Sequence, residues 1–575
     1  MRHHTLQVNE ETHRPAPLWF LLVVIAAAVG VYASTLKNPL LFDDEVIILK
    51  NPGIRTWQSF RHLFDRGYFQ CFQELSYRPV VSLTYLVDHG LWGLKPFGYH
   101  LTNLLLHAAL GAMVFLYLRS IVPGGLVAPA ASLAYVVHPV LTEVVNVAGF
   151  REDSLCALFM FLSLLLYNRA SRAAVSPAAY ALALVSFLIA LFAKETALIL
   201  PALLVLQDLA LRRGAGVWKK RVGLYAGFVA AAVLYGIVRF GVVKNPDELL
   251  VPYAAGSFGN TLLTMPWVVM RYLRILLFPM HLNIRYDFLS IASAADVRFV
   301  LSAIAILALL AIAVWRFRRS PLVAFAILWF FITLGPVSNL VPIGNLMTER
   351  FLTLPLLGFC LLLGGAMETA AVRRGLMPGA VVAMALVLVC YGAFTVARNV
   401  VWGDERLLVQ QSVIGDPESG RAWDAVAQRA IEQRDWPRGR RLCERAQLLL
   451  EPLHQQDSRP VYDLGVCLRN LGELGDAKAQ FDRILKGDPM YYMALLNLAE
   501  ICRLRGDTAC SWQKAAEATK VQPDNPEAWG YLAGLARIMG DRARECEALR
   551  RYVALTVRDD PRLAEALKRM DELCR

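Results

Sequence analysis

The sequence is poor in charge. Asp, Glu, Lys and Arg make up only 18% of its 575 residues, while 56% of the residues are hydrophobic. Soluble domains carry about 25% charged and roughly 45–50% apolar residues, so this balance excludes an ordinary soluble protein and indicates a chain that lies largely in lipid. The long apolar runs all precede Arg398, and the remainder reads as a soluble domain. We therefore predict two domains, residues 1–397 and 398–575.

Three further features are missing. The basic residues, which give a net charge of +12, form short clusters between apolar segments and no continuous face, so we predict no nucleic-acid partner. The loops contain no Cys and His residues at metal-ligand spacing, so we predict no metal and no cofactor. The first apolar run, Leu18–Ser34, precedes no convincing small-residue cleavage site and is interpreted as a retained span.

The apolar runs predict a polytopic membrane protein, because about 20 apolar residues cross the hydrocarbon. Basic clusters mark cytoplasmic loops, and with a cytoplasmic N-terminus they share one side if Leu262–Phe278, with Arg271 and Arg274, does not fully cross and forms an interfacial or re-entrant helix. The resulting odd number of spans places the C-terminal domain on the side opposite the N-terminus. The eleven predicted helical cores are Leu18–Ser34, Leu101–Val122, Leu126–His138, Leu155–Tyr167, Ala178–Ala193, Ala197–Leu211, Leu224–Phe240, Phe299–Trp315, Leu322–Leu340, Phe351–Met367 and Ala380–Val396.

A period of 34 residues runs through the C-terminal domain and predicts a tetratricopeptide-repeat superhelix. Small residues allow paired helices to approach closely, and the second glycine of each repeat ends the first helix of a pair. Cys502 and Cys510 face each other across one hairpin and could pair on an oxidising side, whereas packing as small hydrophobes is expected for most of the domain's six cysteines. The positions that recur are Gly465, Ala499 and Ala533, and Gly472, Gly506 and Gly540. The predicted fold class is therefore all-α throughout.

Under this topology the polar motifs gather on the non-cytoplasmic side. Each motif alone is weak, since a Lys-Glu pair at the end of a span is usually an interfacial anchor. Together they supply carboxylates for acid–base chemistry and Arg or Lys groups for a phosphate, as a lipid-phosphate sugar donor requires. The motifs are Leu41–Glu45, Ser76–Pro79, His138–Glu143 with Arg151–Asp153, Lys194-Glu195 and Glu349-Arg350.

The order of these motifs resembles that of the transmembrane-and-tetratricopeptide O-mannosyltransferases and their prokaryotic relatives. The resemblance covers nearly the whole chain. It rests on Phe42-Asp43-Asp44, Tyr77-Arg78-Pro79, Gly98-Tyr99-His100-Leu101 with Asn103 and His107, His138-Pro139 with Glu143, Lys194-Glu195, Glu349-Arg350-Phe351-Leu352, and the junction Arg398-Asn399 with Trp402 and Glu405.

The resemblance implies a GT-C glycosyltransferase fold with about eleven spans and an active site on the periplasmic or lumenal face. It implies a polyprenyl-phosphate sugar as donor, and inverting transfer of a mannose-like hexose to a Ser or Thr hydroxyl of a protein held by the repeats. In a prokaryote the chain would be integral to the inner membrane, and in a eukaryote to the endoplasmic reticulum membrane.

The resemblance also implies roles for individual residues. Asp43 would be the general base, with Asp44 beside it, and Arg78, Arg151 and Arg350 would hold the donor phosphate. The other substrate-binding residues would be His138, Glu143, Asp153, Lys194, Glu195 and Glu349. Two alternatives stay open: a non-catalytic membrane-anchored scaffold that presents its repeats to a partner, and the same chemistry on a lipid or glycan acceptor.

Overall fold

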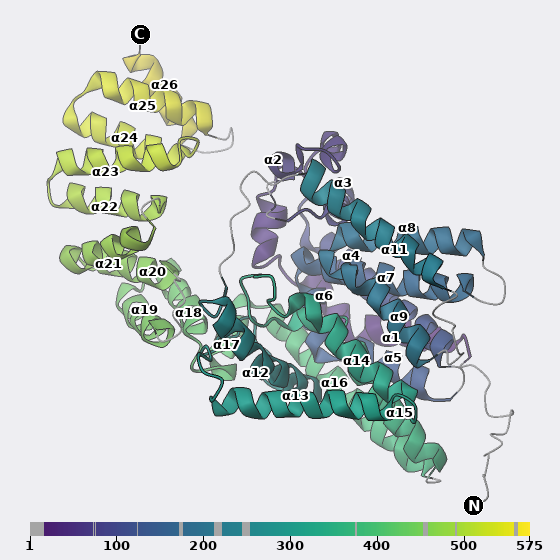
Figure 1. Cartoon of the computed structure of the whole chain (residues 1–575). Helices are drawn as coiled ribbons and strands as arrows, with labels where there is room; N and C mark the ends of the chain where they lie inside the picture. The colour runs from purple at the N-terminus through teal and green to yellow at the C-terminus, as the bar shows by residue number, and fades with distance from the viewer. Residues whose placement is uncertain are drawn as a thin grey trace, which may run out of the picture. The chain divides into compact units, whose positions relative to one another are not determined.

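The protein consists of helices and loops, and no strand occurs among the residues that the structure describes. The computed structural model describes residues 17–72, 74, 76–122, 125–171, 176–211, 221–243, 253–373, 376–451, 458–488, 491–556 and 562–574. Two compact units form, Met1–Asp416 and Pro417–Arg575, here called the membrane unit and the repeat unit (Figure 1). The predicted all-α class is confirmed. Residue 397 lies inside α16 (Met377–Trp402), and the membrane unit also includes α17 (Glu405–Gly415).

Each predicted apolar core coincides with a helix of the membrane unit. Among the described residues, five helices are long and apolar enough to cross a membrane, or six if the bent pair Val127–Val137 and Pro139–Asn146 counts as one span. Three shorter apolar helices, α8, α14 and α15, accompany them. The chain is therefore a polytopic membrane protein, and the count of eleven crossings stays a prediction. The helices are α1 (Phe20–Tyr32), α4 (Pro96–Ile121), α5 (Val127–Val137), α7 (Arg151–Ala170), α8 (Pro177–Ala193), α9 (Leu200–Ala210), α11 (Val222–Gly236), α13 (Val297–Arg316), α14 (Pro321–Leu334), α15 (Leu356–Arg373) and α16.

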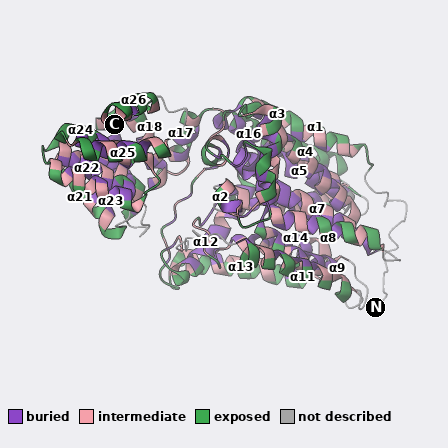
Figure 2. Cartoon of the chain, turned by 90° about the horizontal axis from the view of Figure 1, so that it is seen from above, coloured by how far each residue is buried: buried purple, intermediate pink, exposed green. Residues whose placement is uncertain are grey.

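Burial separates the inner helices of this unit from the outer ones. In α4, 61% of the apolar window is buried, whereas in α13 only 11% is (Figure 2). The apolar side chains of α13, including Leu301 and Leu307, are exposed on the outside of the unit. Exposed apolar faces of this kind suit contact with lipid. The helix α12 (Phe258–Leu277) contains Pro266 and is not among the described helices long and apolar enough to cross.

Three buried asparagines join distant parts of the membrane unit. Asn38 follows the 3₁₀ helix η2 (Ala33–Lys37), and its amide donates to Oδ1 of Asn146 in α6 (Thr142–Asn146) at 2.6 Å. Asn146 donates to Oδ1 of Asn399 at 2.7 Å, and Asn399 donates to the carbonyl of Val31 at 3.0 Å. Buried amides need such partners, so this network fixes the first, middle and last segments of the unit against one another.

The repeat unit is a stack of helical hairpins. Gly472, Gly506 and Gly540 follow α20, α22 and α24, respectively, and their φ angles lie between +71° and +85°. This left-handed conformation often ends a helix, and glycine adopts it with little steric strain. The predicted helix ends are therefore confirmed. The helices are α18 (Gly420–Glu432), α19 (Trp436–Leu450), α20 (Ser458–Asn470), α21 (Leu474–Gly487), α22 (Tyr492–Leu504), α23 (Thr508–Val521), α24 (Pro526–Met539), α25 (Arg542–Leu555) and α26 (Leu563–Leu573).

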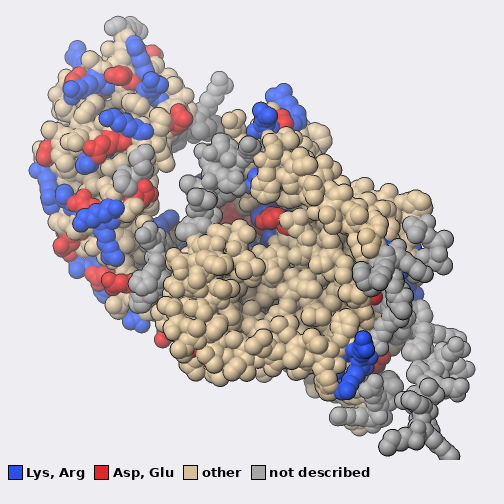
Figure 3. Space-filling model, in the orientation of Figure 1, with Lys and Arg blue, Asp and Glu red and all other residues tan. Residues whose placement is uncertain are grey.

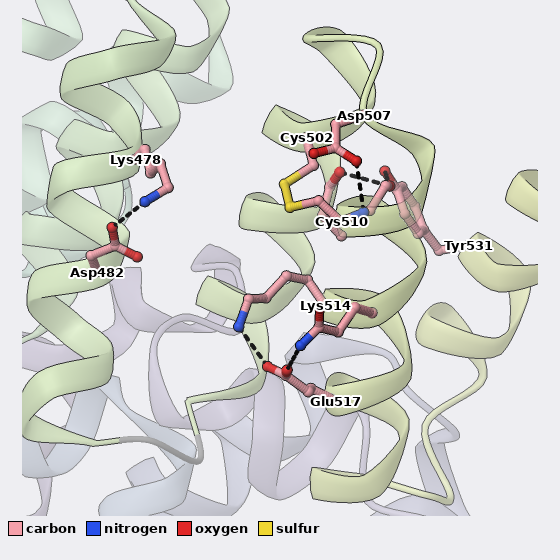
Figure 4. Close-up of a disulfide and its surroundings, with 11 residues drawn as sticks. Lys478, Asp482, Cys502, Asp507, Cys510, Lys514, Glu517 and Tyr531 are labelled. Carbon is pink, nitrogen blue, oxygen red and sulfur yellow. Dashed lines mark hydrogen bonds and ion pairs between the residues drawn. A yellow bond between two sulfur atoms is a disulfide. The ribbon is translucent and has the colours of Figure 1, made fainter.

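Two disulfides connect neighbouring helices of the repeat unit. Cys502 in α22 is bonded to Cys510 in α23 (Figure 4), and Cys546 in α25 is bonded to Cys574 just after α26. The sequence left open whether Cys502 and Cys510 pair, and the structure bonds them. The expectation that packing is the role of most of the six cysteines is wrong, because four of them are bonded. The Cys546–Cys574 pairing depends on where the last helix docks, which the spacing of the cysteines does not show.

Candidate active site

The loop that carries Asp43 and Asp44 is held in an unusual backbone conformation. Phe42 has a φ of +54°, in the left-handed region that a bulky residue rarely adopts. Its ring packs edge-on against Trp402 at the end of α16, with ring centroids 6.1 Å apart. Conformations of this kind persist only where the surroundings fix them, and they cluster at functional sites. The packing of Phe42 therefore sets the position of the two acids that follow it.

Asp44 is fully buried and holds two loops together. Its carboxylate accepts hydrogen bonds from the backbone N–H groups of Gly149 at 2.6 Å, Ala148 at 3.3 Å and Leu41 at 3.3 Å. A Cβ atom at residue 149 would lie 3.2 Å from Oδ1 of Asp44, so glycine allows this close approach. Burial raises the pKa of Asp44 to about 7, and the three N–H donors act against that rise. Asp44 thus anchors the loop instead of facing open space.

Asp43 has the opposite surroundings. It is exposed, and its carboxylate makes no hydrogen bond or ion pair with any residue that the structure describes. Partial burial raises the pKa of Asp43 above its ordinary value, and the Arg350 guanidinium opposes this most strongly, with Arg285 and Arg78 acting in the same direction. Asp43 is therefore a free carboxylate among several positive groups.

Arg350 is held in place by Glu143. The backbone N–H of Arg350 donates to Oε2 of Glu143 at 2.9 Å, and its Nη1 donates to Oε1 at 2.9 Å. The guanidinium carbon also lies 3.9 Å from the ring centroid of Phe150. The Nε atom of Arg350 is buried and has no hydrogen-bond partner within the described ranges. One donor of this fixed guanidinium is thus left for a ligand or for water.

A second set of ion pairs joins the starts of α3 (Pro79–Trp92) and α7 with the end of α8. Arg78 donates to Glu152 at 2.9 Å and lies 3.9 Å from Glu195. Lys194 donates to both oxygens of Asp153, at 2.7 and 2.6 Å, and lies 3.7 Å from Glu152. Four of the predicted site residues therefore meet here. Charged groups collected at one place in an apolar unit are a functional-site signal.

Three other predicted residues are hydrogen-bonded within the protein itself. Each guanidinium nitrogen of the buried Arg151 already donates: Nε to Asn103, Nη1 to Asp88 at 2.6 Å and Nη2 to the carbonyl of Tyr99. His138 pairs one ring nitrogen with the carbonyl of Leu276 and the other with the N–H of Val140. Oε1 of Glu349 accepts from the N–H of Asn283 and the hydroxyl of Tyr286. These contacts fix helices and loops around the charged cluster.

The prediction from sequence missed Glu152, Asp88 and Arg285. Asp88 balances Arg151, and its presence inside the apolar helix α3 was the signal that could have found it. Glu152 lies between two predicted residues. Arg285 lies in a short polar stretch and is exposed, and its guanidinium has no hydrogen bond or ion pair with any described residue. Its free guanidinium is available to an anion.

The repeat unit contains a separate groove of about 710 Å³. Its lining is mixed, with tyrosines and charges of both signs on neighbouring helices. Asn497 donates to the hydroxyl of Tyr462 at 3.0 Å and accepts from Arg469, and Tyr531 donates to Glu500 at 2.9 Å. A lining of this kind offers both flat ring surfaces and polar contacts to a chain-like ligand.

Among the described residues, no group of three or more His, Cys, Asp and Glu side chains is arranged to hold a metal ion. The absence of a metal requirement stays a prediction.

The fold and the charged cluster together define a polytopic membrane protein with a tetratricopeptide-repeat unit. No family model matches the chain. It is 21% identical to the human protein O-mannosyl-transferase TMTC3 over 94% of this chain and 60% of that protein. It is 26% identical to protein O-mannosyl-transferase F38B6.6 of Caenorhabditis elegans over 60% of this chain and 50% of that protein. The resemblance in motif order is thus confirmed by sequence similarity. The chain spans about 60% of the length of human TMTC3.

Among solved structures, the chain is similar to ArnT from Cupriavidus metallidurans bound to undecaprenyl phosphate. The TM-score is 0.37 with 15% identity, covering 82% of this chain and 81% of that one. The repeat unit is similar to YrrB, described as a tetratricopeptide-repeat protein with an unusual peptide-binding site, with a TM-score of 0.23 over 28% of this chain and 82% of that one. Neither score supports a functional conclusion.

Proposed function

We propose that the chain is an inverting glycosyltransferase that moves a hexose from a polyprenyl-phosphate carrier to a Ser or Thr hydroxyl of a protein. Asp43 is the general base, and the arginines around it hold the donor phosphate. The similarity to proteins named protein O-mannosyl-transferases supports mannose as the sugar. The reaction takes place on the extracytoplasmic face of the membrane.

The observation that carries this proposal is the contrast between the two neighbouring acids. Asp44 is fully buried and its carboxylate is directed at three backbone N–H groups inside the protein, away from an acceptor. Asp43 is exposed and unpaired within the described part of the chain. A general base must reach the proton that it removes, and only Asp43 of the pair is placed to do so.

The proposed reaction is a single displacement at the anomeric carbon. The acceptor oxygen forms a bond to that carbon as the bond from the carbon to the phosphate oxygen breaks. Asp43 takes the hydroxyl proton, and polyprenyl phosphate leaves with the bonding electrons. The charge that develops on the leaving phosphate needs cationic partners, which the free guanidinium of Arg285 and the unused Nε of Arg350 supply.

The acidic residues of the cluster hold the cations in position. Glu143 orients Arg350 through two hydrogen bonds, and Glu152 orients Arg78 through one. Charged side chains that are already in position do not have to rearrange when the leaving group departs. A fixed cluster therefore lowers the activation barrier for transfer more than mobile side chains would. A non-catalytic scaffold would have no use for a free carboxylate beside this cluster.

The repeat groove is the proposed binding site for the protein acceptor. Its tyrosines and paired charges suit a polypeptide segment better than a lipid tail. The extracytoplasmic placement is supported by the two disulfides of the repeat unit, because disulfides persist in oxidising compartments.

The test is transfer by the purified full-length chain in lipid nanodiscs. It uses radiolabelled polyprenyl-phosphate mannose and an unstructured acceptor protein rich in Ser and Thr. We expect label on hydroxyl side chains, released by β-elimination, with free polyprenyl phosphate formed in equal amount. Label found only on lipid or glycan would show that the acceptor is a lipid or glycan and not a protein. Absence of any donor turnover, with donor and acceptor both shown to bind, would favour the scaffold.

A further inference from the structure

The cysteines are distributed differently in the two units. The chain has ten, of which Cys71, Cys156, Cys360 and Cys390 lie in the membrane unit and carry no disulfide. The repeat unit holds the other six, and four of these are bonded to a cysteine in a neighbouring helix. Cys443 and Cys467 are the two that remain.

Cys443 and Cys467 lie opposite each other inside the repeat unit. Cys443 is in α19 and Cys467 is in α20, which are packed together, and both side chains are fully buried. Gly439 is one turn before Cys443 on α19, and a Cβ atom there would lie 2.9 Å from the sulfur of Cys467. The Cys467 sulfur is therefore inside the contact between the two helices, on the face that carries Cys443.

The two thiols also influence each other. The neighbouring Cys467 thiol is the main cause that raises the pKa of the Cys443 thiol, and burial acts in the same direction. Packing as isolated small hydrophobes does not require two sulfurs to face each other. Cys156 and Cys360 in the membrane unit illustrate that simpler role, since each is buried and neither has another cysteine as a bonded partner.

We propose that Cys443 and Cys467 form a third disulfide of the repeat unit. The two thiols lose two protons and two electrons as the S–S bond forms. The electrons and protons pass to the disulfide of a thiol oxidase of the same compartment, which is reduced to a dithiol. Because both sulfurs are buried in the folded unit, the bond forms while the hairpins assemble and is afterwards shielded from reductants. All six cysteines would then connect adjacent helices: α19 with α20, α22 with α23, and α25 with the end of the chain.

This inference does not depend on the transfer reaction. It shares with the proposed function only the side of the membrane on which the repeat unit lies. A chain with three such bonds in one unit, and unbonded cysteines elsewhere, is expected where that unit alone meets an oxidising environment.

The test is a count of free thiols in the full chain, taken from membranes quenched in acid, denatured and labelled with a maleimide mass tag. Three disulfides leave four of the ten cysteines free, which is the expected result. A count of six would overturn the third disulfide and leave the transfer reaction untouched. A count of ten would overturn both the disulfide and the oxidising location, while transfer by the purified chain could still be measured separately.

Single substitutions make the count unambiguous. Cys443→Ser is expected to raise the number of free thiols by one, because it releases Cys467. If the two thiols are unbonded, the same substitution lowers the number by one instead. Cys360→Ser is the matched control and lowers the count by one in either case. Because the chains are denatured before labelling, the count does not require a variant to be fully folded.

Discussion

The two units are built from the same element and place their charges in opposite positions. In the membrane unit the outward faces are apolar, as along α13, while Arg151 is fully buried with Asp88 as its partner. In the repeat unit the interior is small and apolar, and exposed ion pairs such as Lys478–Asp482 cover the outside. In Figure 3 the surface of the membrane unit is largely tan, whereas that of the repeat unit carries many blue and red side chains.

The difference shows which charges carry information about function. Exposed pairs on a soluble helix contribute little energy and mainly keep the unit soluble. An ionised group inside an apolar unit is costly, so it is retained where it has a structural or chemical task. In the membrane unit, therefore, a buried charge with a partner has a structural task, and a charged group beside the cluster that has no partner among the described residues is the informative one.

The largest expected effect is that of Asp43→Asn, which removes a carboxylate that has no partner among the described residues. A Ser or Thr hydroxyl is a poor nucleophile at neutral pH, so turnover of purified enzyme should fall by roughly 10²–10⁴-fold. Acceptor binding to the repeat unit should not change. Glu45→Gln is the matched control, because Glu45 is two residues away, exposed, and paired with Lys50. Turnover of Asp43→Asn within a few-fold of the unmodified chain would end the proposed mechanism.

A comparison of Arg285→Ala with Arg151→Ala separates a ligand-binding charge from a structural one. Loss of a charge-assisted hydrogen bond costs about 1.5–3 kcal/mol, so Arg285→Ala should raise the KM for the donor by roughly 10–100-fold. Its melting temperature should stay constant, because no described residue bonds to its guanidinium. Arg151→Ala leaves Asp88 buried and unpaired, and should cost about 3–5 kcal/mol of stability. If Arg285→Ala lowered the melting temperature and Arg151→Ala raised only the KM for the donor, Arg151 would be the ligand-binding residue and Arg285 the structural one.

In the repeat unit, Gly534→Trp tests whether the groove receives the acceptor. Gly534 lines the groove on α24, and nothing lies within 4 Å of a Cβ placed there, so a large ring fits without displacing the backbone. We expect the KM for a protein acceptor to rise about 10-fold, equivalent to about 1.4 kcal/mol, while donor binding is unchanged. Gly534→Ala is the control and should have no effect on KM. Unaltered KM in the Trp variant would argue for an acceptor site elsewhere.

The smallest effect is on the pH profile. Burial raises the pKa of Asp43 and Arg350 lowers it, with a net rise. Since the base acts in its ionised form, kcat/KM should fall with decreasing pH, with a midpoint above the ordinary value of about 4. Arg350→Gln removes the main opposing charge and should move this midpoint to higher pH. A midpoint that does not move would show that another group controls the acid limb.

The sequence predicted the elements better than the roles of individual side chains. Each apolar core coincides with a helix because burial in lipid or in a bundle requires apolar length, which is a local property. The 34-residue period located Gly472, Gly506 and Gly540 because a left-handed residue is needed at each of those helix ends. The meeting of Glu143 with Arg350, 207 residues apart, agreed with the expectation that the polar motifs lie on one side.

The roles of neighbouring residues could not be separated in the same way. Asp43 and Asp44 are adjacent acids, and only the contact with the N–H groups of Ala148 and Gly149 distinguishes them. Arg151 resembled a phosphate ligand because its partner Asp88 is 63 residues away in another helix. Arg285 was missed because a single exposed arginine in a loop is unremarkable until its surroundings are known.

The asparagine network bears on the biogenesis of the protein. Asn38 is synthesised before Asn146 and long before Asn399, which lies in α16. Throughout translation, the amides of Asn38 and Asn146 therefore lack the partner that completes their network. The network is complete only after α16 has been inserted, so the loop of Asp43 and Asp44 next to Asn38 reaches its final packing late, and a chain that stops before Asn399 keeps buried amides without their partner.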